Sequence, residues 1–451
     1  MADTNNPMAG EPLLTQEQER LVAREFLDQY YKRGAITYGV ELQFLVPVLV
    51  KGQADPHPND GRFVLVVEPN TSYEDISRYV VNNTLLVLRQ GARVPAWTHL
   101  GPPYPKKAAL EAMDEESQAV ARMPKYSQWV VEAVPNLLLR RDPFDKNYTW
   151  VGIKVKSSKR DSTSPGHFDP IGNVIVALRR NLRVRVAPST SLMVHIGERL
   201  HDIDSYEMCP SWFRVFCTLW WFVETHVFLL SHHSRRRNGK CLPLKEHSRL
   251  HTMDDEELAE ELADGIQGAD SAHLYQQMHS ILPTTQISNR EQDEVELIWR
   301  AKDAQTLTRL LLVDKIELVA MDGTGVFKPN PTLGRGSLGF QGFCEGADPH
   351  NARKHNDGET GTIEFRNMEG TLDPLLILNW VTVLIKLYEI SRRGKTRDIM
   401  AIIAKSRDSY GGLPLLRDLG LEEQAAYFQT KVNHADSIPE TLENLFIGAY
   451  Q

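Results

Sequence analysis

The chain has 451 residues, of which 41% are hydrophobic and 24% are charged, and its formal net charge at pH 7 is -8. These values are typical of a globular protein with room for two or three domains. The negative charge excludes an overall attraction to nucleic acid or to anionic membranes, although a local basic patch can still form.

The four cysteines form no close pair in the sequence. This argues against a zinc site or a disulfide framework and favours a reducing compartment, so we expect a cytoplasmic protein. Residues 1–12 are polar and lack the apolar core of a signal peptide. The most apolar run, 212–230, contains Arg214 and Glu224, so we expect a buried helix there and no membrane span.

Residues 38–46 alternate between apolar and polar side chains, which is typical of a strand with one buried face. Glu41 and Gln43 share the polar face of this strand. The apolar face carries Val40, Leu42 and Phe44.

Three later segments, 148–156, 192–196 and 362–369, repeat this pattern. Their polar faces carry Lys154 and Lys156, then Met193 and His195, then Glu364, Arg366 and Met368. If these strands pair, one side of the sheet is polar and helices cover the other side, which is an α+β arrangement of layers. The alternative is an amphipathic sheet whose polar face is merely solvated.

The segment around Glu364 and Arg366 has the clearest chemistry. The carboxylate can hold a metal ion or an ammonium group. The guanidinium can bind a carboxylate or a phosphate through two parallel hydrogen bonds. The alternative is an ion pair on an exposed strand, which contributes almost nothing to stability.

The remaining pattern indicates the domain organisation. Residues 1–14 are expected to be disordered, 15–392 to form an α+β domain, and 393–451 to add a C-terminal helical extension. Within the domain, 92–127 and the acidic, helix-prone 245–300 are interpreted as surface insertions. The Gly- and Asn-rich segment 322–359 is interpreted as a lid over the site.

Several of these segments resemble the fungal-type amidoligase family. The residues that carry the resemblance are Tyr-Gly-Val-Glu-Leu-Gln-Phe at 38–44, Met-Val-His-Ile-Gly at 193–197, Trp-Phe-Val-Glu at 221–224, Arg-Arg-Arg-Asn-Gly-Lys-Cys-Leu-Pro-Leu at 235–244 and Thr-Ile-Glu-Phe-Arg-Asn-Met-Glu-Gly-Thr-Leu-Asp at 362–373. They occur in the expected order. The family is similar to the carboxylate–amine ligases, which include glutamate–cysteine ligase and glutamine synthetase. The resemblance implies a curved, mostly antiparallel half-barrel sheet, with helices on its back and ATP and Mg²⁺ in its funnel.

The resemblance also implies roles for single residues. Glu41 and Glu364 would bind Mg²⁺, which prefers hard oxygen ligands. Arg366 would stabilise the charge of a transferring phosphoryl group, and His195 would orient the substrate or the phosphate. The residues expected to contact the nucleotide are Lys154, Lys156, Arg183, Arg185, Arg235 and Arg236.

The chain departs from the family pattern at several expected ligands. Gln43 and Lys154 stand where carboxylates are usual, and Met193 and Met368 stand where histidines are usual. The family's Trp-led strand usually continues to an Asp. In this chain Val134 stands at that position in strict register, and the nearest carboxylate is Glu132. A lysine at a ligand position repels Mg²⁺, so this sequence predicts a thinned metal site.

Three functions therefore remain open. The first is an ATP-dependent ligase that joins a small, amino acid-like carboxylate to an amine through an acyl phosphate. The second is an acyl or aminoacyl transferase that takes a pre-activated, phosphate-bearing donor such as an acyl-coenzyme A or a charged tRNA, because basic residues gather between 154 and 185. The third is a non-catalytic relative that binds a small anion or a partner. Fungal relatives of this kind suggest specialised metabolism.

Other candidates have simpler interpretations. Glu224, in an apolar helix, is expected to form a structural ion pair with Arg235 or Arg236. His232 and His233 are adjacent at a helix end, so their rings are expected to diverge and not to share a metal. The glycine-rich segment 334–339 resembles a phosphate loop only weakly and is interpreted as part of the lid.

Overall fold

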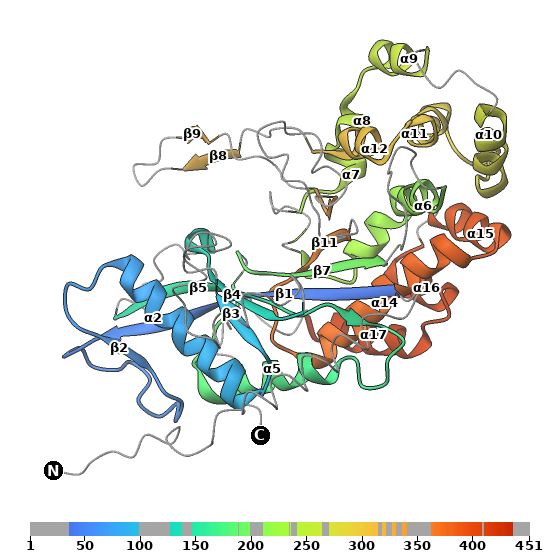
Figure 1. Cartoon of the computed structure of the whole chain (residues 1–451). Helices are drawn as coiled ribbons and strands as arrows, with labels where there is room; N and C mark the ends of the chain where they lie inside the picture. The colour runs from blue at the N-terminus through green and yellow to red at the C-terminus, as the bar shows by residue number, and fades with distance from the viewer. Residues whose placement is uncertain are drawn as a thin grey trace, which may run out of the picture. The chain divides into compact units, whose positions relative to one another are not determined.

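The computed structural model describes residues 36–98, 127–137, 147–187, 189–198, 211–233, 235, 241–263, 270–313, 318–321, 327–330, 336–340, 362–407 and 410–435. Over these residues the chain has an α+β fold with a mixed, open sheet of nine strands (Figure 1). The predicted fold class, α+β with a curved sheet, is confirmed. Four of the six strand pairings described in register are antiparallel.

The chain divides into two compact units. Unit 1 comprises Met1–Ser191, Gly370–Ile377 and Glu443–Gln451, and unit 2 comprises Leu192–Glu369 and Leu378–Leu442. The expected domain over 15–392 stays a prediction. The helical character expected within 245–300 and after residue 393 is confirmed.

The described residues of unit 1 contain six strands, of which the first is the longest. Their bounds are β1 (Ile36–Val50), β2 (Leu65–Val67), β3 (Ala96–Thr98), β4 (Trp129–Ala133), β5 (Tyr148–Lys156) and β6 (Arg160–Asp161). β1 pairs antiparallel with β5 and β6 and parallel with β2. On the other side of β5, the antiparallel neighbour is β4, which pairs parallel with β3.

The two faces of this part of the sheet differ as the alternation predicts. Leu42, Phe44 and Val155 are fully buried, whereas Glu41 and Lys154 are only partly buried. Helix α2 (Tyr73–Leu86), which begins at the N-cap Ser72, contacts β3, β4 and β5. It continues as a π-helical turn over Val87–Gly91, against which α5 (Asp169–Asn181) packs. Among the described residues, the apolar face of these strands is therefore buried, whereas the side chains of Glu41 and Lys154 on the other face stay partly exposed.

Unit 2 is mostly helical. Its helices are α6 (Ser211–Phe228), α7 (Leu244–His247), α8 (Arg249–Thr252), α9 (Asp255–Ala263), α10 (Asp270–Ile281), α11 (Asn289–Arg300), α12 (Ala304–Leu311), most of α14 (Pro374–Arg393), α15 (Thr396–Ser406), α16 (Gly412–Asp418) and α17 (Glu422–Ala435). Its sheet strands are β7 (Ser191–Glu198, beginning at the last residue of unit 1), β10 (Leu338–Gly339) and β11 (Thr362–Glu369). β8 (Leu318–Met321) and β9 (Phe327–Asn330) form a separate antiparallel pair.

The apolar run predicted as a buried helix is α6. Phe216 and Trp220 of α6 meet Phe365 of β11 edge-on, with ring centroids 5.9 and 5.3 Å apart. Trp220 and Trp221 are almost completely buried. These contacts confirm that the segment belongs to the core.

Helix α14 is, among the described residues, the one helix with the length and hydropathy of a membrane span. Half of its apolar window is buried inside the protein, as in the core helices of globular proteins. Trp380, Val381 and Leu384 in this helix are fully buried.

Candidate functional site

Three neighbouring strands of unit 1 place four charged side chains on one face. Glu41 of β1 lies opposite Lys156 of β5, and Glu132 of β4 lies opposite Lys154 of β5. Because both lysines are on the central strand, each ammonium group reaches carboxylates on both sides. Glu41, Glu132, Lys154 and Lys156 are referred to below as the charge cluster.

The charge cluster is closely paired and still accessible. The Lys154 Nζ lies 3.0 Å from a Glu132 carboxylate oxygen and 3.6 Å from one of Glu41. The Lys156 Nζ lies 3.2 Å from Glu132 and 3.9 Å from Glu41. The exposed fractions of the side chains run from 12% for Glu41 to 34% for Lys156. A ligand can therefore reach these groups from solvent.

The pairing within the charge cluster shifts the pKa values of Glu132 and Lys154. Burial opposes ionisation of Glu132, but the charges of Lys154 and Lys156 outweigh it and hold the pKa of Glu132 below its usual value. Burial likewise opposes the charge on Lys154, but Glu41 and Glu132 raise its pKa above the usual value. The ion pairs therefore favour the charged forms of Glu132 and Lys154.

Two neutral neighbours shape the charge cluster. Gln43 lies opposite Lys154, and its Oε1 accepts a hydrogen bond from the Ser191 hydroxyl at 2.8 Å. Gly152 lets the chain around Val134 approach β5, because a Cβ at residue 152 would lie 2.3 Å from the Val134 carbonyl oxygen. The carboxylate that β4 places opposite Lys154 is that of Glu132.

Glu132 is a residue that the sequence reasoning set aside. Trp129 and Val131 are buried, so Glu132 lies on the opposite face of β4, and the register places it opposite Lys154 of β5. The alternation of apolar and polar residues along β4 is the sequence signal that could have identified Glu132.

Arg183, which was expected to contact the nucleotide, lies in a different network. Its Nη1 donates to Asp55 at 2.8 Å and to the Tyr148 hydroxyl at 3.1 Å, and Asp60 lies 3.5 Å from its Nε. The hydrogen bond from Arg183 holds the pKa of Asp55 well below its usual value. Tyr148 precedes Lys154 by six residues on β5, roughly 20 Å of extended chain. This network is therefore separate from the charge cluster.

Arg185 is also buried. Its side chain is 1% exposed, and its guanidinium carbon lies 5.6 Å from the ring centroid of Trp150. Its backbone N–H and C=O pair with Leu45 of β1. The basic residues between 154 and 185 therefore do not form one open patch.

In unit 2, Glu364 and Arg366 bind each other. The Arg366 Nε donates to Glu364 Oε1 at 2.9 Å, and Nη2 donates to Oε2 at 2.6 Å. Both residues are 6% exposed, so the pair is buried and is not the surface ion pair that the sequence left as the alternative. The Arg366 Nη1 donates to the carbonyl oxygens of Gly336 and Leu338, both at 3.2 Å. The guanidinium thus holds two strands together in this structure.

Strand β10 lies beside this ion pair in the sheet. Gly339 lies opposite Glu364, and a Cβ at residue 339 would lie 2.2 Å from the Arg366 Nη2. The glycine therefore serves the close approach of two strands. Residues 336–340, which fall within the segment interpreted as a lid, are buried and belong to the sheet or its end.

Glu224 is fully buried and is held by neutral donors. It accepts hydrogen bonds from the backbone N–H groups of Leu244 and Lys245 at 2.9 and 3.1 Å, from Trp220 Nε1 at 3.2 Å and from the Ser337 hydroxyl. Burial raises its pKa. Of the two partners expected for Glu224, Arg235 is wrong, because neutral donors bind the carboxylate, and Arg236 lies outside the described residues.

The other expected residues in and around unit 2 are placed as follows. Arg235 is 1% exposed and donates to the Arg366 carbonyl oxygen at 2.7 Å. Arg236 lies outside the described residues. His195 lies on β7 and is partly buried, next to the buried Met193. The imidazole rings of His232 and His233 do not diverge as expected, since their centroids are 4.1 Å apart.

The residues that the resemblance assigns to Mg²⁺ do not fit a resident divalent ion. Glu41 faces two ammonium groups, and both oxygens of Glu364 bind Arg366. A divalent cation binds carboxylate oxygens at about 2.0–2.6 Å and is repelled by neighbouring cations. Within the described ranges, no group of three or more His, Cys, Asp or Glu side chains is placed to hold a metal.

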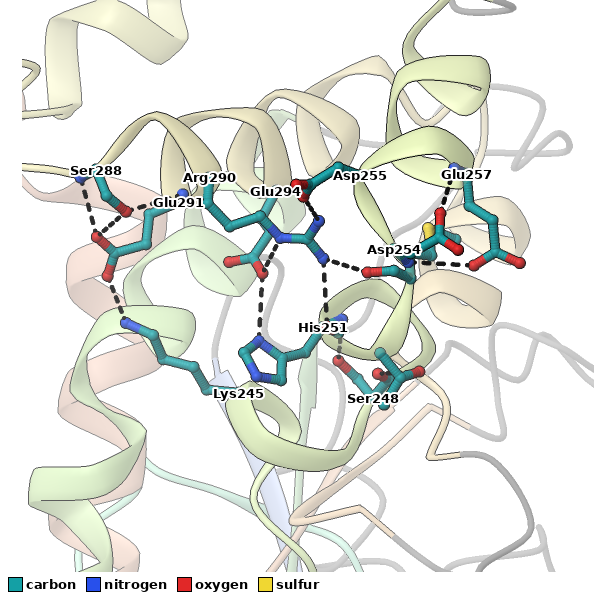
Figure 2. Close-up of polar contacts among 12 residues, drawn as sticks. Lys245, Ser248, His251, Asp254, Asp255, Glu257, Ser288, Arg290, Glu291 and Glu294 are labelled. Carbon is teal, nitrogen blue, oxygen red and sulfur yellow. Dashed lines mark hydrogen bonds and ion pairs between the residues drawn. The ribbon is translucent and has the colours of Figure 1, made fainter.

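A further polar network, not predicted from the sequence, joins α7, α8 and α11 of unit 2. Figure 2 shows Arg290 and His251 pointing toward the carboxylate of Glu294, with both nitrogens 3.2 Å from its Oε1. Glu291 accepts from Lys245 at 2.9 Å and from Arg407. Burial opposes ionisation of Glu291, but the hydrogen bonds from Arg407 and Lys245 outweigh it and lower its pKa to about 2. This network holds helices together.

Comparison of the chain with protein-family models, with curated proteins and with solved structures found no match.

Proposed function

We propose that this chain is an ATP-dependent carboxylate–amine ligase, which joins a small, amino acid-like carboxylate to an amine through an acyl phosphate. The observation that supports the proposal is the charge cluster. Its acids and amines are partly exposed on one face of a sheet whose other face is sealed by apolar packing. Binding of two small, charged substrates needs such a surface.

In this proposal ATP binds as its magnesium complex, as a substrate. A substrate carboxylate oxygen attacks the γ-phosphorus, the bond to the β-phosphate oxygen breaks, and ADP leaves. The amine then attacks the acyl carbon, and inorganic phosphate leaves. Lys154 and Lys156 act as point charges that hold the anionic oxygens. Glu41 and Glu132 hold the incoming ammonium group, which loses its proton to water before the amine attacks.

The remaining candidates have supporting roles in the proposal. Gln43 orients the carboxylate beside Lys154 through its side-chain amide, whose oxygen is fixed by Ser191. Glu364 and Arg366 act as positioning residues that keep β10 and β11 together. Arg183 positions the segment around Asp55. The proposal places the enzyme in the cytoplasm, in specialised metabolism and without a membrane partner.

Isothermal titration of ATP, with and without Mg²⁺, tests the proposal. We expect the wild type to bind magnesium–ATP and Lys154→Met to bind it about tenfold more weakly, because one ammonium contact is lost. Lys51→Met is the matched control, since the Lys51–Glu68 pair is an exposed ion pair outside the charge cluster. The absence of ATP binding in the wild type would contradict the ligase proposal.

A second candidate, a non-catalytic relative that binds a small anion, is favoured by one observation. Glu364 and Arg366, the residues with the clearest catalytic chemistry in the sequence, satisfy each other. Binding of small carboxylates without any binding of ATP would support this candidate. The transferase alternative has less support, because Arg183 and Arg185 are buried and Arg183 binds Asp55 in a separate network.

A further inference from the structure

In the charge cluster, the two positive charges of Lys154 and Lys156 balance the two negative charges of Glu41 and Glu132. Glu41 and Glu132 come from the two strands that flank β5, and Lys154 and Lys156 lie between them on β5. Each ammonium nitrogen lies within 3.9 Å of both carboxylates. Two single positive charges thus stand between two carboxylates, where one divalent ion would give the same balance.

We propose that Lys154 and Lys156 are built-in cations that take the place of a divalent metal ion between Glu41 and Glu132, and that this subsite binds the anionic group of its substrate directly through their ammonium groups. The inference deepens the proposed function and rests on it for the role of the subsite. The replacement of the metal is a property of the four side chains alone.

The geometry supports this replacement in two ways. A divalent ion that bound Glu41 and Glu132 would have to displace both ammonium groups or bind beside them against their repulsion. In addition, each lysine has three N–H donors, and the two carboxylates account for two of them. At least one N–H of each lysine can therefore face a ligand, since the Lys154 and Lys156 side chains are 20% and 34% exposed.

The closing experiment measures Mn²⁺ binding by electron paramagnetic resonance, without nucleotide. We expect Glu41→Gln to leave Mn²⁺ binding unchanged, because Glu41 holds no metal. We expect the double variant Lys154→Gln/Lys156→Gln to bind Mn²⁺ at least about tenfold more tightly than the wild type, because two carboxylates become free to bind the ion. Adding Glu41→Gln to the double variant should abolish this gain. Lys51→Gln is the control and should gain nothing.

Two results would overturn the inference. One is Mn²⁺ binding by the wild type that disappears in Glu41→Gln, which means that the cluster is a metal site as it stands. The other is a folded double variant without any gain in Mn²⁺ affinity. If the double variant does not fold, as judged by its near-ultraviolet circular dichroism, the single variant Lys154→Gln decides by the same criterion. Failure of ATP binding would contradict the ligase proposal and would leave the Mn²⁺ result interpretable.

Discussion

The charge cluster of unit 1 and the Glu364–Arg366 pair of unit 2 use the same kinds of side chain on strands and serve different purposes. In the cluster, each lysine is shared by two carboxylates, and the side chains are 12–34% exposed. In the pair, one guanidinium binds one carboxylate and two carbonyl oxygens, and both side chains are 8% exposed. The two sites differ in their exposure to solvent and in the partners of the cation. In unit 2 the guanidinium lies against the neighbouring strand β10, where Gly339 has no side chain.

The largest effect is expected from breaking the buried pair. Arg366→Met leaves Glu364 buried without its cation and two carbonyl oxygens without donors, so we expect a loss of about 3–5 kcal/mol in the free energy of unfolding. Urea denaturation measures this loss. The double variant Glu364→Gln/Arg366→Met should be less destabilised than Arg366→Met, because no buried charge remains. Equal unfolding of Arg366→Met and the wild type would show that the pair is not structural.

The close approach of β10 and Arg366 at Gly339 allows a second test of the same comparison. In Gly339→Ala the new Cβ would lie 2.2 Å from the Arg366 Nη2, so that β10 or the guanidinium must move. We expect a destabilisation of about 1–3 kcal/mol, measured by thermal unfolding. Gly172→Ala is the control, because nothing lies within 4 Å of a Cβ at this helical position. A Gly339→Ala variant with the thermal stability of the wild type would mean that β10 and Arg366 are not in close contact.

The pH dependence of stability tests a partly buried carboxylate of unit 2, Glu291. Its folded-state pKa, about 2, lies below the ordinary value for a glutamate. Its contribution is therefore complete above the unfolded-state pKa of about 4.3 and is lost as the pH falls toward 2. We expect Glu291→Gln to cost roughly 1–3 kcal/mol at pH 7 and nothing near pH 2. Equal costs at both pH values in chemical denaturation would contradict this assignment.

The smallest effect on stability is expected in the charge cluster itself. Lys154→Met should change the free energy of unfolding by less than about 1 kcal/mol, since partly exposed ion pairs contribute little. The same substitution should weaken ligand binding. A large loss of stability, similar to that of Arg366→Met, would show that the cluster is a structural tie like the pair in unit 2.

The sequence was sufficient to predict what depends on local periodicity. The two faces of β1 follow from the alternation around Glu41, and the burial of α6 follows from its apolar run. The association of Glu364 with Arg366 was also expected as one alternative, because side chains two residues apart share a face of a strand.

What the sequence could not give depends on partners far away in the chain. The register between β4 and β5 brings Glu132 to Lys154, and neither residue indicates it alone. Asp55 neutralises Arg183 across 128 positions, from a segment that is simply polar in sequence. Likewise, Gly339 lies in a Gly-rich segment that is typical of a loop, but in the structure it lies on β10 against the Glu364–Arg366 pair. In each case tertiary contacts decide the role of the residue.

The most direct test of the ligase proposal is trapping of the acyl phosphate by hydroxylamine. The wild type would be mixed with magnesium–ATP, hydroxylamine and a pool of amino acids and small dicarboxylic acids, and the hydroxamate formed would be measured. We predict hydroxamate formation that requires ATP, persists in Lys51→Met and falls about a hundredfold in Lys154→Met, since the charge that holds the reacting anion is lost. Hydroxamate formation that is equal in Lys154→Met and the wild type, or absent from the wild type, would contradict the account.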